Sequence, residues 1–73
     1  IIERGVLQYQ PDRGIFSSFY QVKLQQATVY KPPVIGWWVL VGSQEPIFFR
    51  CSSDHQAQKW IDKCVLNGAT FRL

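Results

Sequence analysis

The chain has 73 residues, of which 47% are hydrophobic and 15% aromatic, with a net charge of +3. A disordered tail would carry far fewer aromatic side chains, so the composition predicts one small globular domain over 1–73, or part of one. So short a chain leaves little scaffold for a catalytic cleft and disfavours most enzymes. The longest apolar run, 37–41, is far shorter than the roughly 20 residues that a membrane-spanning helix needs.

The charged residues are scattered along the chain and form no run. Eight Lys and Arg residues stand against five Asp and Glu residues. Such a mild excess is typical of a solubilising surface and is compatible with weak attraction to acidic lipid or acidic proteins. The sequence shows neither aromatic residues interleaved with basic ones nor a stripe of Lys and Arg. We therefore do not expect nucleic acid as a partner.

The residues that could carry chemistry are few. Cys51 and Cys64 are too few for a disulfide scaffold, and the N-terminus shows no signal-peptide pattern, so we expect reduced thiols and a cytoplasmic location. With His55 they make only three possible metal ligands, whereas structural zinc usually has four. His55 stands alone, and the acids show no paired spacing. We therefore expect no enzyme, no metal and no cofactor.

The first part of the chain, 1–52, has the pattern of about five antiparallel strands. Turn signals at 11–14, 32–33 and 42–46 separate them. Alternation is clearest in the last strand, where Ile47, Phe49 and Cys51 point to one side and Phe48 and Arg50 to the other. The predicted strands are 5–9, 20–24, 27–31, 37–41 and 46–51.

A helix is predicted over 54–66. Ser53 and Gln56 have capping-box spacing, and Asn67-Gly68 is a typical helix stop. Between them, apolar residues recur with helical spacing, at Ala57, Trp60, Ile61, Cys64 and Val65.

A sheet with two apolar faces must curl or pack against this helix. We therefore expect a mainly β fold, in which a partial barrel is capped by the C-terminal helix. Trp37, Phe49, Trp60 and Ile61 are predicted core residues. In particular, Trp60 should be largely buried against the strands.

The segment 36–64, "GWWVLVGSQEPIFFRCSSDHQAQKWIDKC", resembles the end of a pleckstrin-homology (PH) domain. Those domains close with two strands and then a helix that bears a central tryptophan. Trp60 matches that tryptophan, and 47–51 match the last strand. The resemblance implies the PH superfold.

The front half permits two alignments with this family. In one, 4–33 cover the opening three strands and the middle strands are deleted. In the other, which we favour, the chain is the C-terminal half of a split or truncated domain, and its complementary half is a partner. The ending 64–73, "CVLNGATFRL", also resembles the third lobe of FERM domains, which shares the superfold.

The resemblance implies two functions. The first, which we favour, is a signalling or scaffold module that binds a protein partner near membranes, in some relatives by adding a partner strand beside the last helix. Its candidate binding residues, taken as exposed, are Trp38, Phe48, Arg50 and Lys59.

The alternative function is membrane recruitment through a phosphoinositide headgroup. Basic residues on the opening strands would surround the phosphates, and the candidates are Arg13, Lys23 and Lys31. The chain would then associate peripherally with an acidic phospholipid surface.

Overall fold

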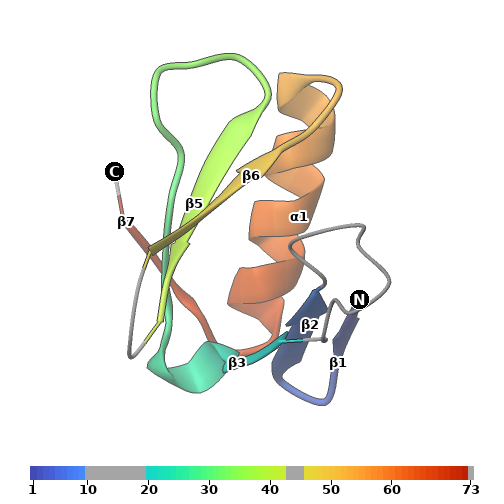
Figure 1. Cartoon of the computed structure of the whole chain (residues 1–73), viewed down its shortest axis with the longest axis vertical. Coiled ribbons are helices and arrows are strands. Elements are labelled where there is room, and N and C mark those ends of the chain that lie inside the picture. Colours follow the sequence, from blue (N-terminus) through green and yellow to red (C-terminus); the bar gives the residue numbers. More distant parts are fainter. Residues whose placement is uncertain (10–19, 43–45, 73) are drawn as a thin grey trace.

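The computed structural model describes residues 1–9, 20–42 and 46–72. These residues form two sheets, with strand orders β1-β2-β3 and β6-β5-β4-β7, and one α-helix (Figure 1). The fold is mainly β with a C-terminal helix, as the sequence predicts. The elements are β1 (Ile2–Glu3), β2 (Val6–Tyr9), β3 (Tyr20–Lys23), a 3₁₀ turn (Leu24–Gln26), β4 (Thr28–Tyr30), β5 (Trp37–Val41), β6 (Pro46–Arg50), α1 (Asp54–Leu66) and β7 (Thr70–Arg72).

The predicted bounds of β5 and α1 match the structure. The short strands β1 and β7 were not predicted. β7 pairs with β4 in a parallel arrangement, whereas the sequence analysis expected antiparallel strands alone. The two sheets do not close into a barrel. The predicted turn at 11–14 lies outside the described residues.

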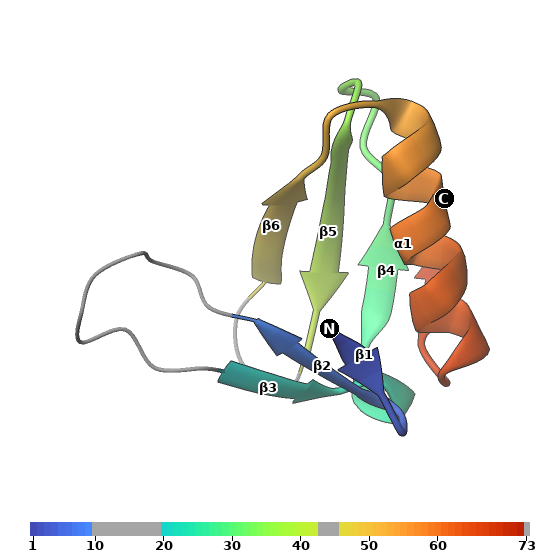
Figure 2. The same ribbon diagram turned by 90° about the vertical axis from the view of Figure 1, so that its right-hand side faces the viewer.

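The helix α1 lies along one face of the four-stranded sheet, where it contacts β4, β5 and β7 (Figure 2). It therefore covers a face of an open sheet, whereas the sequence predicted that it caps a partial barrel. The three-stranded sheet β1-β2-β3, called the small sheet below, crosses the lower end of the same face. There the rings of Tyr9 in β2 and Phe49 in β6 meet edge to face, with 5.6 Å between their centres. Among the described residues, no helix lies on the opposite face of the four-stranded sheet (Figure 1).

Both ends of α1 are capped by side chains. The Ser53 hydroxyl accepts a hydrogen bond from the Gln56 backbone N–H at 3.2 Å. The Gln56 side chain accepts from the backbone N–H and the hydroxyl of Ser52, so the reciprocal bond falls one residue before the helix cap. At the other end, the Asn67 amide donates to the Lys63 carbonyl at 2.8 Å, and Gly68 follows with φ 113°. These contacts confirm the predicted start and stop signals.

The core lies between α1 and the covered face of the sheet. Its fully buried side chains are Leu24, Val29, Leu40, Ile61 and Cys64. Trp60 and Phe49 are half-buried at the edge of this cluster. The prediction that Trp60 is largely buried is therefore wrong in degree, because its side chain packs against the core cluster but stays partly exposed.

The two tryptophans of β5 exchange the roles that we predicted for them. Trp38 is 2% exposed and packs under α1, so its assignment as an exposed binding residue is wrong. Trp37 is half-buried on the opposite face, so it is not a residue of the helix-side core. The physical reason is that 37–41 are all apolar, and a continuous apolar run does not show which alternate residues face the core.

Candidate interaction site

The face of the four-stranded sheet opposite α1 carries a group of large side chains, which we call the open face. The register pairs Tyr30 with Val39, Val39 with Phe48, and Trp37 with Arg50. Paired residues on neighbouring strands point to the same face, and so does every second residue along a strand. The open face therefore consists of Tyr30, Trp37, Val39, Val41, Phe48 and Arg50, together with Arg72, which pairs with Tyr30.

Phe48 is the most prominent side chain of the open face. It is 65% exposed, whereas Val39 beside it is only 9% exposed. The guanidinium carbon of Arg50 lies 6.0 Å from the centre of the Trp37 ring, within the range of a cation–π contact. The face thus presents an exposed aromatic ring next to a cation that rests on a second aromatic ring.

The charges on the open face have one sign. Arg50 and Arg72 are its two cations, and the described residues of β4, β5, β6 and β7 include no carboxylate. Exposed apolar area that is rimmed by polar residues often marks a binding surface. This arrangement is complementary to a partner that offers both apolar and acidic groups.

A second feature is an aromatic crevice of about 250 Å³ between the two sheets and α1. Its lining includes four aromatic residues, Tyr9, Trp38, Phe49 and Trp60. The rings of Trp38 and Phe49 are stacked, with 4.2 Å between their centres. The indole N–H of Trp38 is buried and has no hydrogen-bond partner among the described residues. Because these rings also join β2, β5, β6 and α1, the crevice is mainly a packing junction of the fold.

The Tyr9 hydroxyl and the thiol of Cys64 are titratable groups that the fold perturbs. Burial raises the pKa of Tyr9, and the neighbouring Tyr20 raises it further. Burial alone raises the pKa of Cys64 to about 11. A thiol with a raised pKa is a poor nucleophile at neutral pH, so Cys64 is a packing residue.

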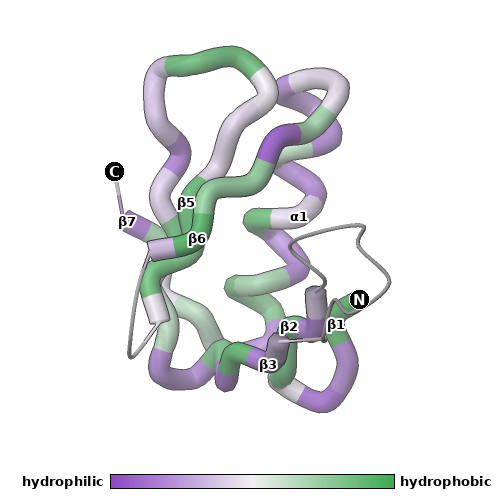
Figure 3. The backbone as a smooth tube through the Cα atoms, in the orientation of Figure 1, coloured by the Kyte–Doolittle hydropathy of each residue, from purple (hydrophilic) through white to green (hydrophobic). Residues whose placement is uncertain are grey.

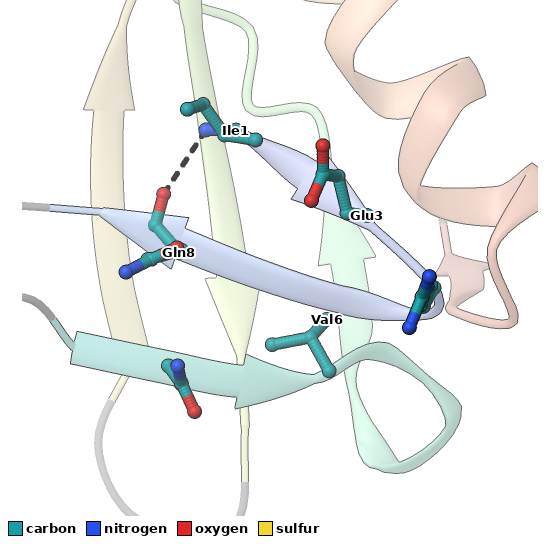
Figure 4. A pocket seen from close by; sticks show the side chains of 6 residues that line it. Ile1, Glu3, Val6 and Gln8 are labelled. Carbon is teal, nitrogen blue, oxygen red and sulfur yellow. Dashed lines mark hydrogen bonds between the residues drawn. The ribbon is translucent and has the colours of Figure 1, made fainter.

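A depression of about 570 Å³ lies on the three-stranded sheet (Figure 4). Its polar lining residues are Glu3, Arg4, Gln8 and Gln21. The amino group of Ile1 donates a hydrogen bond to the Gln8 carbonyl at 3.0 Å. The Glu3 carboxylate and the Arg4 guanidinium offset each other, and the remaining charge, on the Ile1 amino group, is already engaged by the Gln8 carbonyl. It offers no convergent set of groups for an anion or a metal.

The candidate headgroup residues are not brought together. Lys23 ends β3, before the turn that leads into β4, whereas Lys31 follows the far end of β4. The Lys31 ammonium donates to the Gln58 side chain of α1 at 3.4 Å. Arg13 lies outside the described residues. The two described lysines therefore do not form one phosphate site.

The candidate partner-binding residues divide into three groups. Phe48 and Arg50 lie together on the open face, as predicted. Lys59 is exposed on α1, which packs on the opposite side of the sheet, and Trp38 is buried. The sequence analysis missed Trp37, yet a hairpin centred on 42–46 places it across from Arg50.

His55, the one histidine, is exposed in the first turn of α1. Among the described residues, no group of three or more His, Cys, Asp and Glu is placed to hold a metal ion. Within the same ranges, no helix is long and apolar enough to cross a membrane. Comparison of the chain with known protein-family models, curated proteins and solved structures finds no match.

Proposed function

We propose that this chain is a non-catalytic interaction module whose open face binds an acidic protein partner. The observation that carries the proposal is the exposed Phe48 beside the Trp37–Arg50 pair. An aromatic ring supplies apolar contact area at small entropic cost, and arginine over a ring is a frequent element of binding hot spots. Within a larger signalling or scaffold protein of the cytoplasm, such a module would recruit the partner.

Charge complementarity selects the chemistry of the partner. The open face has two arginines and no carboxylate among its described residues, so a basic partner would be repelled. Figure 3 shows that the middle of β6 is hydrophobic, and Phe48, its residue on the open face, is 65% exposed, so we expect the partner to offer apolar side chains as well. A segment that mixes carboxylates with aromatic or aliphatic side chains satisfies both conditions.

The phosphoinositide alternative has less support. It requires several cations around one phosphate group, and Lys23 and Lys31 lie at opposite ends of β4. The assignment of the chain to the PH superfold is likewise a proposal, and its support is the sequence pattern of 36–64.

The experiment measures binding of two synthetic copolymers, poly(Glu,Tyr) and poly(Lys,Tyr), by isothermal titration calorimetry. We expect the acidic copolymer to bind, with an affinity that falls as salt is raised, and the basic one not to bind. Arg50→Glu should weaken binding about tenfold, and Trp37→Ala should also weaken it.

The matched control is Lys59→Glu, which changes the net charge by the same amount on an exposed position of α1. We expect it to leave binding nearly unchanged. Equal losses in Arg50→Glu and Lys59→Glu would show mere charge attraction and would overturn the proposal. Binding to phosphoinositide vesicles that Lys23→Ala abolishes, without binding to poly(Glu,Tyr), would favour the membrane alternative instead.

A further inference from the structure

β6 is an edge strand of the four-stranded sheet, and its outer side has no strand beside it among the described residues. The Cys51 backbone N–H donates to the Gly36 carbonyl, and hydrogen-bonded pairs alternate along an antiparallel ladder. Phe49 and Ile47 therefore bond to β5. The N–H and C=O groups of Phe48 and Arg50 then point away from the sheet.

This edge has little to prevent pairing with another strand. Natural edge strands are commonly protected by charges, prolines or bulges. In β6, the proline and the charge stand only at the ends, as Pro46 and Arg50, and the three residues between them are Ile47, Phe48 and Phe49. The middle of the edge is thus apolar, and the outward N–H and C=O of Phe48 have no strand beside them among the described residues.

We propose that two copies of the chain pair through their β6 strands, antiparallel, about a two-fold axis at Phe48. Each Phe48 N–H would donate to the Phe48 carbonyl of the other copy. Each Arg50 N–H would donate to the Pro46 carbonyl of the other copy, which gives four backbone hydrogen bonds. Pro46 has no N–H, and in this register it needs only to accept.

The side chains are self-complementary in the same register. Phe48 meets Phe48 on the open face, and Ile47 meets Phe49 on the helix side, so the central pairs are apolar. Arg50 lies across from Pro46 and not from a second Arg50, which avoids opposed like charges. A register centred on Phe49 would pair only three residues, and one centred on Arg50 would oppose the two arginines. The register at Phe48 is the one that pairs all five residues of β6.

The dimer would join two four-stranded sheets into one continuous eight-stranded sheet. Both open faces would lie on the same side, each with its own Trp37–Arg50 pair. A partner with two acidic segments would then gain from bivalent binding. The dimer itself does not depend on the proposed function, because Trp37 lies on β5, and Trp37→Ala should leave association unchanged.

The first test is sedimentation velocity over a concentration series. We expect a monomer–dimer equilibrium for the native chain. Phe48→Ala and Phe48→Pro both remove the ring, but only proline removes the outward N–H, and proline is tolerated at such edge positions. Phe48→Pro should be monomeric throughout, whereas Phe48→Ala should still dimerise at higher concentration. Circular dichroism verifies that both variants are folded.

The second test traps the register and does not depend on proline being tolerated. In a Cys51→Ser background, Phe48→Cys should form a disulfide-linked dimer quickly under mild oxidation, because directly paired Cα atoms lie within disulfide range. Leu66→Cys, at an 85% exposed position of α1, is the matched control and should cross-link slowly. A native chain that stays monomeric at all concentrations, or equal cross-linking of the two variants, would overturn the proposal.

Discussion

The two faces of the four-stranded sheet are made by the same strands but differ in how far their apolar side chains are buried. On the covered face, Val29, Leu40 and Trp38 are at most 2% exposed beneath α1 and the small sheet. On the open face, Phe48 is 65% exposed although it is as apolar as its neighbours. The difference shows that hydrophobicity alone does not determine burial in this chain. Burial also depends on which face α1 covers and on the neighbouring side chains, since Val39 on the open face is only 9% exposed.

The helix α1 covers one face, so the apolar residues of the other face lie outside the helix-side core. An antiparallel sheet with one solvated face usually alternates apolar with polar residues. Here β5 is apolar on both faces, with Trp37 and Val39 opposite to Trp38 and Leu40. The open face thus carries apolar residues where the usual pattern of a solvated face would place polar ones. Departures of this kind from the usual pattern are expected at functional surfaces.

The largest predicted contrast is between the two tryptophans of β5. Trp38→Ala should lower the free energy of unfolding by about 3–5 kcal/mol, because it leaves a cavity under α1. Trp37→Ala, on the open face, should cost only about 1 kcal/mol. Trp38→Phe should cost less than Trp38→Ala, because both remove the unpartnered buried N–H but phenylalanine keeps an aromatic ring and leaves a smaller cavity. Chemical denaturation measures all three values, and equal losses at positions 37 and 38 would contradict the comparison.

The pH dependence of stability reports on the contact between α1 and the covered face. Burial raises the pKa of Cys64 from 9.0 to about 11, so the folded state keeps a proton that the unfolded chain releases. Stability from this group is therefore complete below pH 9 and is lost as the pH rises towards 11, by at most about 3 kcal/mol. Denaturation at pH 8, 9 and 10 should show this fall. Cys64→Ala should show a shallower slope, and an unchanged slope would contradict the assignment.

Gly36 holds the loop before β5 against the start of α1. Its φ is 81°, its N–H donates to the Asp54 carboxylate at 2.6 Å, and an added Cβ would lie 2.7 Å from the Cys51 carbonyl oxygen. Gly36→Ala should therefore cost about 2 kcal/mol and loosen the helix over the covered face. Gly42→Ala is the control, since the one atom of the described residues near its added Cβ is a methyl of the Val22 side chain, at 3.2 Å. Thermal melts of both variants should differ by several degrees.

A smaller effect is expected at the helix cap. Ser53→Ala removes the acceptor for the Gln56 N–H and should cost about 1 kcal/mol. Ser52→Ala removes a hydroxyl that donates to the same Gln56 side chain, yet its backbone N–H bond remains. We expect it to cost less than Ser53→Ala. If Ser52→Ala lowered the free energy of unfolding more than Ser53→Ala, the assignment of Ser53 as the main cap of α1 would be wrong.

Elements with strong local signals were predictable from the sequence. The helix 54–66 has a cap, a stop and a regular apolar spacing, and each is a short-range property. The strand 46–50 alternates, so Phe48 and Arg50 were assigned to the correct face. These two residues are the part of the candidate site that the sequence predicted.

The remaining features depend on contacts between distant parts of the chain. β7 exists because Thr70–Arg72 pair with β4, some 40 residues earlier, and three residues carry too little pattern to reveal this. The roles of Trp37 and Trp38 depend on which face α1 packs against. Likewise, the expected phosphate site required Lys23 and Lys31 to lie together, which only the path of the chain around β4 decides.

The smallest expected effect on stability is at the centre of the open face. Phe48→Ala removes a ring that is 65% exposed and should lower the free energy of unfolding by about 0.5 kcal/mol, or a few degrees in Tm. The measurement is a thermal melt at low protein concentration, where association through β6 contributes nothing. Leu40→Ala, fully buried in the neighbouring strand, is the control and should cost at least about 2 kcal/mol. If Phe48→Ala were as damaging as Leu40→Ala, the open face would be covered within the chain itself, and it would not be available to a partner.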